Sequence, residues 1–311
     1  MNKELFKVVN GNCNVTLYGN GTRVVETINP NATDIVLDYP LSLDINISNR
    51  CSNGCPYCYA GNTPEGAIAN LLDMTYLDDV SGIEIAINIQ FPLPDHFETW
   101  LEKMKKQNII VNGTINQIDL ERDPQLIDWL YNLHTDNLLH GIGISYRDYN
   151  NDLYNNIRSS LGDDIVVHTI IGITPINEII KLLDEGFKIL ILGYKQKNRG
   201  VNYFSQVNID NWVKGIDRII SHPFNSVIAF DTAGLKQAKI RDILTKDQWD
   251  SSYQGDEGTI SFYIDAVKHT FNIDSHTNRT PYSIGEKNLK DMFKIIKNVS
   301  KGDDSDEINK K

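Results

Sequence analysis

The stretch LSLDINISNRCSNGCPYC, residues 41–58, decides the fold of this chain. Apolar and polar residues alternate from Leu41 to Ile47, and this period of two predicts a strand. A polar loop follows and carries Cys51, Cys55 and Cys58, three of the four cysteines in the 311 residues. Thiols this close together suit a metal site in a reducing compartment better than a disulfide framework. The fourth cysteine, Cys13, stands apart and is predicted to be structural.

Strands and helices alternate after this loop, in units of about thirty residues. We expect further strands at residues 82–89, 109–118, 139–145, 165–173 and 188–192, and helices at residues 96–106, 124–133, 151–161, 176–185 and 209–220. Such alternation predicts right-handed crossovers and a parallel sheet. A partial barrel and an open, doubly wound sheet both satisfy the pattern.

The alternating pattern covers residues 39–225, which are predicted to form the core domain. The regions before and after this domain have other patterns. Residues 14–18 and 22–28 are β-rich and flank Gly19-Asn20-Gly21, so residues 1–38 are predicted to form an N-terminal β-hairpin appendage. Strand patterns at 227–230 and 259–267, with a helical pattern at 233–245, predict a C-terminal α/β extension over residues 226–301 that closes the barrel. Residues 302–311 are polar without periodicity and are predicted to be a disordered tail.

The chain is acidic, with 41 Asp and Glu residues against 30 Lys and Arg residues and a formal net charge of −11. Extended phosphate-binding surfaces need many basic side chains, so this balance argues against a large nucleic-acid partner, although a small nucleic-acid site stays open. The start of the chain lacks the pattern of a signal peptide, and no stretch is long enough to span a bilayer. We therefore expect a cytoplasmic protein without a membrane partner.

Three ligands, rather than four, are the informative feature of the cysteine loop. A structural zinc site normally uses four protein ligands, whereas an iron-sulfur cluster with three cysteine ligands keeps one iron free to bind another molecule. The spacing of Cys51, Cys55 and Cys58 therefore indicates an open, reactive site. Two alternatives are a zinc knuckle completed by a nearby histidine and a chance grouping of thiols.

The three cysteines at this spacing, with Tyr57 before the third and a strand before the loop, resemble the radical S-adenosylmethionine superfamily. The resemblance implies a partial (β/α)6 TIM-like barrel and a [4Fe-4S] cluster held by Cys51, Cys55 and Cys58. It also implies reductive cleavage of S-adenosylmethionine at the free iron, giving a 5′-deoxyadenosyl radical that abstracts hydrogen from a substrate. A flavodoxin or a ferredoxin would supply the electron.

More narrowly, the chain resembles radical S-adenosylmethionine proteins that are common in phage genomes and have no assigned function. The motifs that carry this likeness are short: Thr114-Ile-Asn-Gln117, Gly141-Ile-Gly-Ile-Ser145, Leu192-Gly-Tyr-Lys195, Gly255-Asp-Glu-Gly258 and Tyr263-Ile-Asp-Ala-Val267. Together they extend the likeness from about Val15 to most of the chain. They support the fold more than an activity.

One segment departs from the family pattern. After the second strand the family carries a Gly-Gly-Glu-Pro-like turn that contacts the methionine amino group, whereas this chain has Asn88-Ile-Gln-Phe-Pro92. Without glycine the backbone cannot approach a ligand as closely. We expect Asn88 or Gln90 to supply a side-chain carbonyl instead; the alternative is that binding of S-adenosylmethionine is altered or lost.

Polar residues at the carboxyl ends of strands are candidates for the remaining site, because barrel sites form there. The resemblance assigns cofactor contacts to such residues, and Arg147 can pair with a carboxylate through two hydrogen bonds. His168 is equally well explained as a satisfied core residue, the loop 193–200 as a solvated loop, and Tyr263 and Asp265 as solvent-facing. The candidate cofactor-binding residues are Tyr57, Asn88, Gln90, Asn116, Gln117, Ser145, Arg147, His168, Tyr194 and Lys195, and the candidate substrate-binding residues are Arg199, Asp231, Tyr263 and Asp265.

The function predicted from the sequence is that of a radical S-adenosylmethionine enzyme acting on an unidentified substrate, in nucleotide, nucleic-acid or peptide modification. The rival hypothesis is a non-catalytic iron-sulfur module that binds or senses redox state on the same barrel. Formation of 5′-deoxyadenosine separates the two, because only the enzyme makes it.

Overall fold

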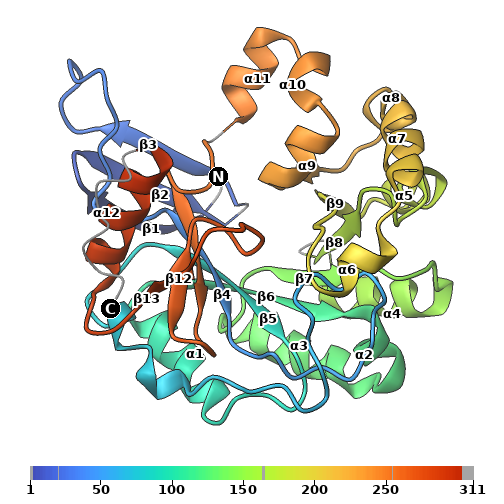
Figure 1. Ribbon diagram of the computed structural model, residues 1–311, viewed down its shortest axis with the longest axis horizontal. Coiled ribbons are helices and arrows are strands. Elements are labelled where there is room, and N and C mark those ends of the chain that lie inside the picture. Colours follow the sequence, from blue (N-terminus) through green and yellow to red (C-terminus); the bar gives the residue numbers. More distant parts are fainter. Residues whose placement is uncertain (1–2, 20, 163–164, 254, 303–311) are drawn as a thin grey trace.

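Six parallel strands in chain order form the centre of the protein, as the computed structural model shows for residues 3–19, 21–162, 165–253 and 255–302 (Figure 1). Each of these strands pairs in parallel with the next one along the chain. The mixed α/β fold with a parallel sheet is therefore confirmed. The strands are β4 (Ser42–Asn46), β5 (Glu84–Ile89), β6 (Ile110–Asn116), β7 (Ile142–Ser145), β8 (Ile165–Ile170) and β9 (Lys188–Leu192).

The sheet continues on both sides of these six strands. On one side β10 (Ile228–Phe230) pairs in parallel with β9; on the other β11 (Ser261–Asp265) pairs in parallel with β4, followed by β12 (Thr270–Asn272) and β13 (Tyr282–Ser283). The edge strands β10 and β13 are not paired with each other in the part of the chain that the structure describes. The described strands thus form no closed barrel, and the (β/α)6 barrel stays a prediction.

The expected helices between the strands are present, with two local differences. They are α1 (Phe97–Lys106), α3 (Gln125–Thr135), α4 (Asn151–Leu161) and α5 (Ile176–Asp184). The predicted helix at 209–220 is split at Gly215 into α7 (Gln206–Lys214) and α8 (Ile216–Ile220), and the one at 233–245 is split at Lys239, which has a φ of 52°, into α9 (Thr232–Gln237) and α10 (Ile240–Ile243).

The strand predicted at 109–118 ends earlier than expected. The Asn116 side chain accepts a hydrogen bond from the Ile118 backbone N–H at 3.0 Å, which caps an unpredicted helix, α2 (Gln117–Arg122). Asparagine is a favoured cap because its side-chain oxygen satisfies an N–H that the first turn leaves unpaired. The cap places the start of α2 beside the cysteine loop.

Alternate residues of the central strands face two different environments. Leu43, Ile45, Ile85 and Ile87 are buried, whereas the positions between them are partly or fully exposed. The same alternation runs through β6, β8 and β9. One face of the sheet therefore forms the core, and the other is an open face that carries many polar side chains.

The N-terminal region forms a three-stranded antiparallel sheet. The predicted pair is present as β2 (Cys13–Tyr18) and β3 (Arg23–Thr27), and β1 (Glu4–Asn10), which was not predicted, pairs with β2. Val15 and Leu17 of β2 belong to the main core. An ion pair between Arg23 and Glu84 joins this sheet to β5.

Three further helices were not predicted: α6 (Arg199–Tyr203), α11 (Lys246–Ser252) and α12 (Leu289–Ser300). Helix α12 packs Leu289, Met292, Phe293 and Ile296 into the main core. Most of the predicted tail, residues 303–311, lies outside the described residues. Within the described ranges, no helix has the length and apolar character needed to cross a membrane.

Candidate functional site

The cysteine loop leaves β4 at its carboxyl end, and a second stretch of backbone holds its start. The backbone N–H of Cys51 donates to the Thr63 carbonyl at 2.9 Å, and that of Asn49 donates to the Ala67 carbonyl at 2.8 Å. Within the loop, the Cys58 N–H donates to the Cys55 carbonyl at 3.2 Å. These bonds fix the backbone that presents the three thiols.

The three thiols are free, partly buried and close enough to influence one another. Burial raises the pKa of the Cys51 and Cys55 thiols, and neighbouring cysteines raise it further. The three sulfur atoms do not all lie within 4.8 Å of one another. A single zinc ion with Zn–S bonds of about 2.3 Å would hold its sulfurs roughly 3.8 Å apart. At least one pair of thiols is therefore farther apart than a single zinc ion would hold it, and a cluster with one iron for each sulfur can span such a separation.

Side chains from two distant helices hold the cysteine loop. Arg199, at the start of α6, donates through Nε to the Cys55 carbonyl at 3.0 Å and through Nη1 to the Asn62 carbonyl at 2.9 Å. Asn53 donates to the Asp119 carboxylate of α2 at 2.8 Å. Arg199 was predicted to bind substrate, and its guanidinium instead contacts the loop backbone.

Asn88 and Gln90 contact the strand end that precedes the cysteines. The Asn88 side chain accepts from the Ile47 N–H and donates to the Ser48 carbonyl, both at 2.9 Å. In the amide orientation that satisfies both of its ends, the Gln90 nitrogen donates to the carbonyls of Ser48 at 2.9 Å and Arg50 at 3.1 Å. Both side chains were predicted to replace the glycine turn of the family, and both are engaged in fixing this loop.

A row of polar side chains crosses the open face next to the thiols. Asn116, Ser145 and His168 are neighbours in register on β6, β7 and β8. The Asn116 Nδ2 lies 3.9 Å from the Cys55 Sγ. A Cβ at Gly143 would lie only 2.7 Å from the His168 ring, so the glycine of β7 leaves room for the imidazole. The row gives an adenosine or methionine group several hydrogen-bonding partners beside the cysteines.

His168 is expected to make the stability of the protein depend on pH in the acid range. Burial lowers its pKa to about 4, below the value of about 6.5 for an unfolded chain. The unfolded state then binds more protons between these values, so stability falls as pH decreases from 6.5 to 4, by up to about 3 kcal/mol. In urea unfolding, His168→Gln should lose less stability over this window than the wild type or the control His96→Gln; equal losses would contradict this.

Two predicted cofactor contacts are not brought to the site. Gln117 is fully buried, its nitrogen donates to Glu121 and Asp148, and its oxygen accepts from the Arg147 N–H and the Tyr154 hydroxyl. Tyr194 is 5% exposed, and its hydroxyl donates to the Gly200 carbonyl at 2.7 Å. The polar groups of both side chains are occupied by the protein, which gives them structural roles.

The rim beside the cysteine loop carries Tyr57 and Arg147. Tyr57 packs edge to face against Tyr203 of α6, with ring centroids 5.8 Å apart, and burial raises its pKa to about 12. The Arg147 side chain is 53% exposed, and its Nε lies 3.7 Å from the Asp148 carboxylate. This exposure leaves Arg147 accessible to a carboxylate, and its role in binding one stays a prediction.

Lys195 and the acidic residues around it form a cluster of charges near the cysteine loop. Lys195 is partly buried. Its Nζ lies 4.6 Å from the centre of the ring of Tyr59, the residue directly after Cys58, and 3.9 Å from the Asp231 carboxylate. Burial alone would lower the pKa of Lys195, but Tyr59, Asp231, Asp44 and Glu257 together raise it. This arrangement keeps Lys195 charged.

The carboxylates around Lys195 include one that the sequence analysis missed. Asp44 of β4 is an exposed residue on the open face. Protein atoms around its carboxyl group reduce its hydration, and this desolvation raises its pKa. Tyr263 of β11 is its partner in register. Asp265 is buried against Asn46 and Lys268, and Asp231 caps α9, so neither faces solvent freely. The alternating pattern of β4 would have placed Asp44 on the open face.

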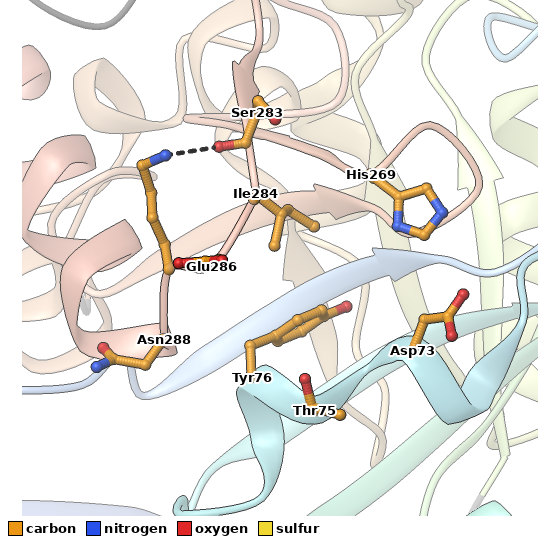
Figure 2. A pocket seen from close by; sticks show the side chains of 10 residues that line it. Asp73, Thr75, Tyr76, His269, Ser283, Ile284, Glu286 and Asn288 are labelled. Atoms are coloured by element: carbon orange, nitrogen blue, oxygen red, sulfur yellow. Dashed lines mark hydrogen bonds between the residues drawn. The ribbon is translucent and has the colours of Figure 1, made fainter.

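A separate pocket of about 420 Å³ lies away from these residues. Figure 2 shows its lining: Asp73, Thr75 and Tyr76 on one side, and His269 and the segment from Ser283 to Asn288 on the other. None of its lining residues belongs to the cysteine loop or to the polar row. It is not part of the candidate site.

Comparisons with known proteins give information on the fold alone. No family model matches the chain, and no curated protein matches it. The chain resembles SuiB of Streptococcus suis in its fold. The TM-score is 0.55 at 13% identity, over 83% of this chain and 66% of SuiB, so the chain spans just under two thirds of that protein. A mutant tryptophan synthase alpha-subunit from Pyrococcus furiosus gives a TM-score of 0.40 at 12% identity, over 85% of this chain and 98% of the other, which carries no argument.

Proposed function

We propose that the protein is a radical S-adenosylmethionine enzyme whose Cys51, Cys55 and Cys58 bind a [4Fe-4S] cluster. The observation that carries this proposal is the set of three free thiols on a loop that backbone hydrogen bonds hold at the carboxyl end of β4, with at least one pair of sulfurs more than 4.8 Å apart. When bound, the cluster would supply the electron that cleaves S-adenosylmethionine into methionine and a 5′-deoxyadenosyl radical. The parallel α/β fold supports the proposal, because family members carry the loop at this place.

The residues of the open face would bind and orient the cofactor and the substrate. Asn116 and Ser145 are placed to hydrogen-bond the nucleoside or the methionine group beside Cys55, and Arg147 to pair with a carboxylate. His168 stays neutral near pH 7, so it offers one donor and one acceptor. Lys195, Asp44 and Tyr263 would contact the substrate on the other side of Tyr59.

The charges of this face favour one of the two substrate classes. Asp44, Asp231 and Glu257 interact with the ammonium group of Lys195. Carboxylates repel the phosphates of nucleic acids, whose binding relies on basic side chains. A peptide is therefore the preferred substrate within the proposal, and a flavodoxin or a ferredoxin is the proposed electron donor.

A specific observation supports the rival function, a non-catalytic iron-sulfur module. Asn88 and Gln90, which replace the glycine turn of the family, use their side chains to hold the backbone of residues 47–50. Their polar groups are then not free to bind the methionine amino group. This module would keep the cluster for stability or redox sensing and would not cleave S-adenosylmethionine.

Anaerobic reconstitution tests both functions. The full chain is loaded with iron and sulfide, reduced with dithionite and mixed with S-adenosylmethionine, and 5′-deoxyadenosine and methionine are quantified. Equal amounts of both products, formed only when cluster, reductant and S-adenosylmethionine are all present, are expected. A stable cluster without cleavage would replace the enzyme by the non-catalytic module, and failure to form any cluster would overturn both.

A further inference from the structure

A second group of metal-ligating side chains lies in the C-terminal region. Glu257 precedes β11, and Asp274 and His276 follow β12. One ligand atom from each of the three lies within 4.8 Å of the others, and in the described part of the chain no other set of three such residues meets this spacing. The set combines an imidazole nitrogen with two carboxylate oxygens, so it is not simply a patch of acidic residues.

The histidine of this group has a nitrogen without a hydrogen-bond partner. The His276 Nδ1 is shielded from solvent and makes no hydrogen bond within the described residues. It lies 3.1 Å from the Asp274 Oδ1, but that oxygen already accepts from the backbone N–H groups of His276 and Thr277. A buried polar atom is normally paired. A cation between the imidazole and the carboxylates would bind this nitrogen's lone pair.

The charges around the group favour a divalent cation. Four carboxylates interact there, those of Asp44, Asp231, Glu257 and Asp274, and the two nearby ammonium groups are those of Lys195 and Lys197. Lys197 donates to the Thr277 carbonyl at 3.1 Å, and Lys195 donates to Ser275 at 3.3 Å, so both are held in place. Carboxylates outnumber ammonium groups here by four to two, and a bound cation would relieve the repulsion among the carboxylates.

We propose that Glu257, Asp274 and His276 form a mononuclear site for a divalent first-row transition-metal ion, separate from the cysteine loop. Imidazole and carboxylate ligands together suit manganese, iron or zinc, and the absence of thiolate from the set disfavours the softer ions. Three protein ligands leave the remaining coordination positions to water or to an oxygen of a substrate. The site does not depend on the proposed radical chemistry.

Manganese is the probe that tests this site, because Mn²⁺ prefers oxygen and nitrogen ligands to thiolates. The full chain is titrated with Mn²⁺, and the free ion is followed by the loss of its six-line electron paramagnetic resonance signal on binding. One bound Mn²⁺ per chain is expected, both in the wild type and in a variant with Cys51, Cys55 and Cys58 all replaced by alanine. The triple variant cannot hold the cluster, so this result separates the two proposals.

Variants of the ligands and of a neighbouring charge sharpen the test. Glu257→Gln and His276→Gln should each weaken Mn²⁺ binding by at least about tenfold, whereas Glu286→Gln, at an exposed position, should leave it unchanged. Lys195→Met should tighten binding by roughly tenfold, because a like charge is removed. Wild-type protein that binds no Mn²⁺, or ligand variants that bind it equally well, would overturn the proposal. If a ligand variant does not fold, the direction of the Lys195→Met effect decides the outcome.

Discussion

Replacing Cys51, Cys55 or Cys58 with alanine is expected to reduce cluster retention by at least about a hundredfold, because loss of a direct ligand costs more than loss of an outer contact. Each thiol would bind a different iron, so the two remaining cysteines cannot share the missing position. Formation of 5′-deoxyadenosine should fall in parallel. The measurements are iron and sulfide content and the visible absorbance after anaerobic reconstitution.

The chain contains its own control for this experiment. Cys13 is fully buried in β2, and its thiol donates to the Asn12 side chain at 3.0 Å, in the N-terminal sheet. Cys13→Ala should cost about 1 kcal/mol in stability through a small cavity and leave iron content unchanged. Iron retained by Cys55→Ala, or lost equally by Cys13→Ala, would show that the loop is not the cluster site.

Gly66→Ala is expected to destabilise the protein by about 3 kcal/mol and to lower iron retention, although Gly66 is not a ligand. A Cβ at this position would lie 1.9 Å from the Asn49 carbonyl oxygen and 2.7 Å from the Arg50 nitrogen, both backbone atoms just before Cys51. Backbone atoms cannot rotate aside, so the start of the cysteine loop must move. Urea unfolding and iron content after reconstitution measure the two effects.

Gly54 provides the matched control for Gly66. It lies within the loop at a φ of 62°, but a Cβ there would meet nothing within 4 Å. Gly54→Ala therefore introduces only the strain of a left-handed backbone, about 1 kcal/mol. The argument requires the larger loss at Gly66. A larger loss at Gly54 would mean that backbone conformation, and not close approach, limits this loop.

Local patterns were sufficient to predict most of the sheet and the cysteine loop. Strands β5 and β9 and helix α4 were placed within two residues at each end, because burial of one side imposes a period on each element. Cys51, Cys55 and Cys58 were recognised from the sequence because all three lie close together in one short loop. Their role as cluster ligands stays a prediction.

Contacts between distant segments could not be predicted from these patterns. Tyr263 meets Asp44 only because β11 inserts beside β4, and nothing in either segment specifies that pairing. Gln117 was expected at the end of a strand, facing the site. The Asn116 cap instead starts a helix at Gln117, and the Gln117 side chain is buried in the core. A single capping bond thus outweighed the strand pattern.

The contact between Arg199 and the cysteine loop also sets an order of events during protein synthesis. Cys55 and Arg199 are separated by 144 positions in the chain, which a ribosome adding roughly 5 to 20 residues per second takes about 7 to 30 seconds to translate. Throughout that interval the thiols have emerged without the helix that holds their loop. Iron delivery after α6 has emerged would meet a loop already held by Arg199, whereas a chain stalled before α6 would present its thiols on a loop without this contact.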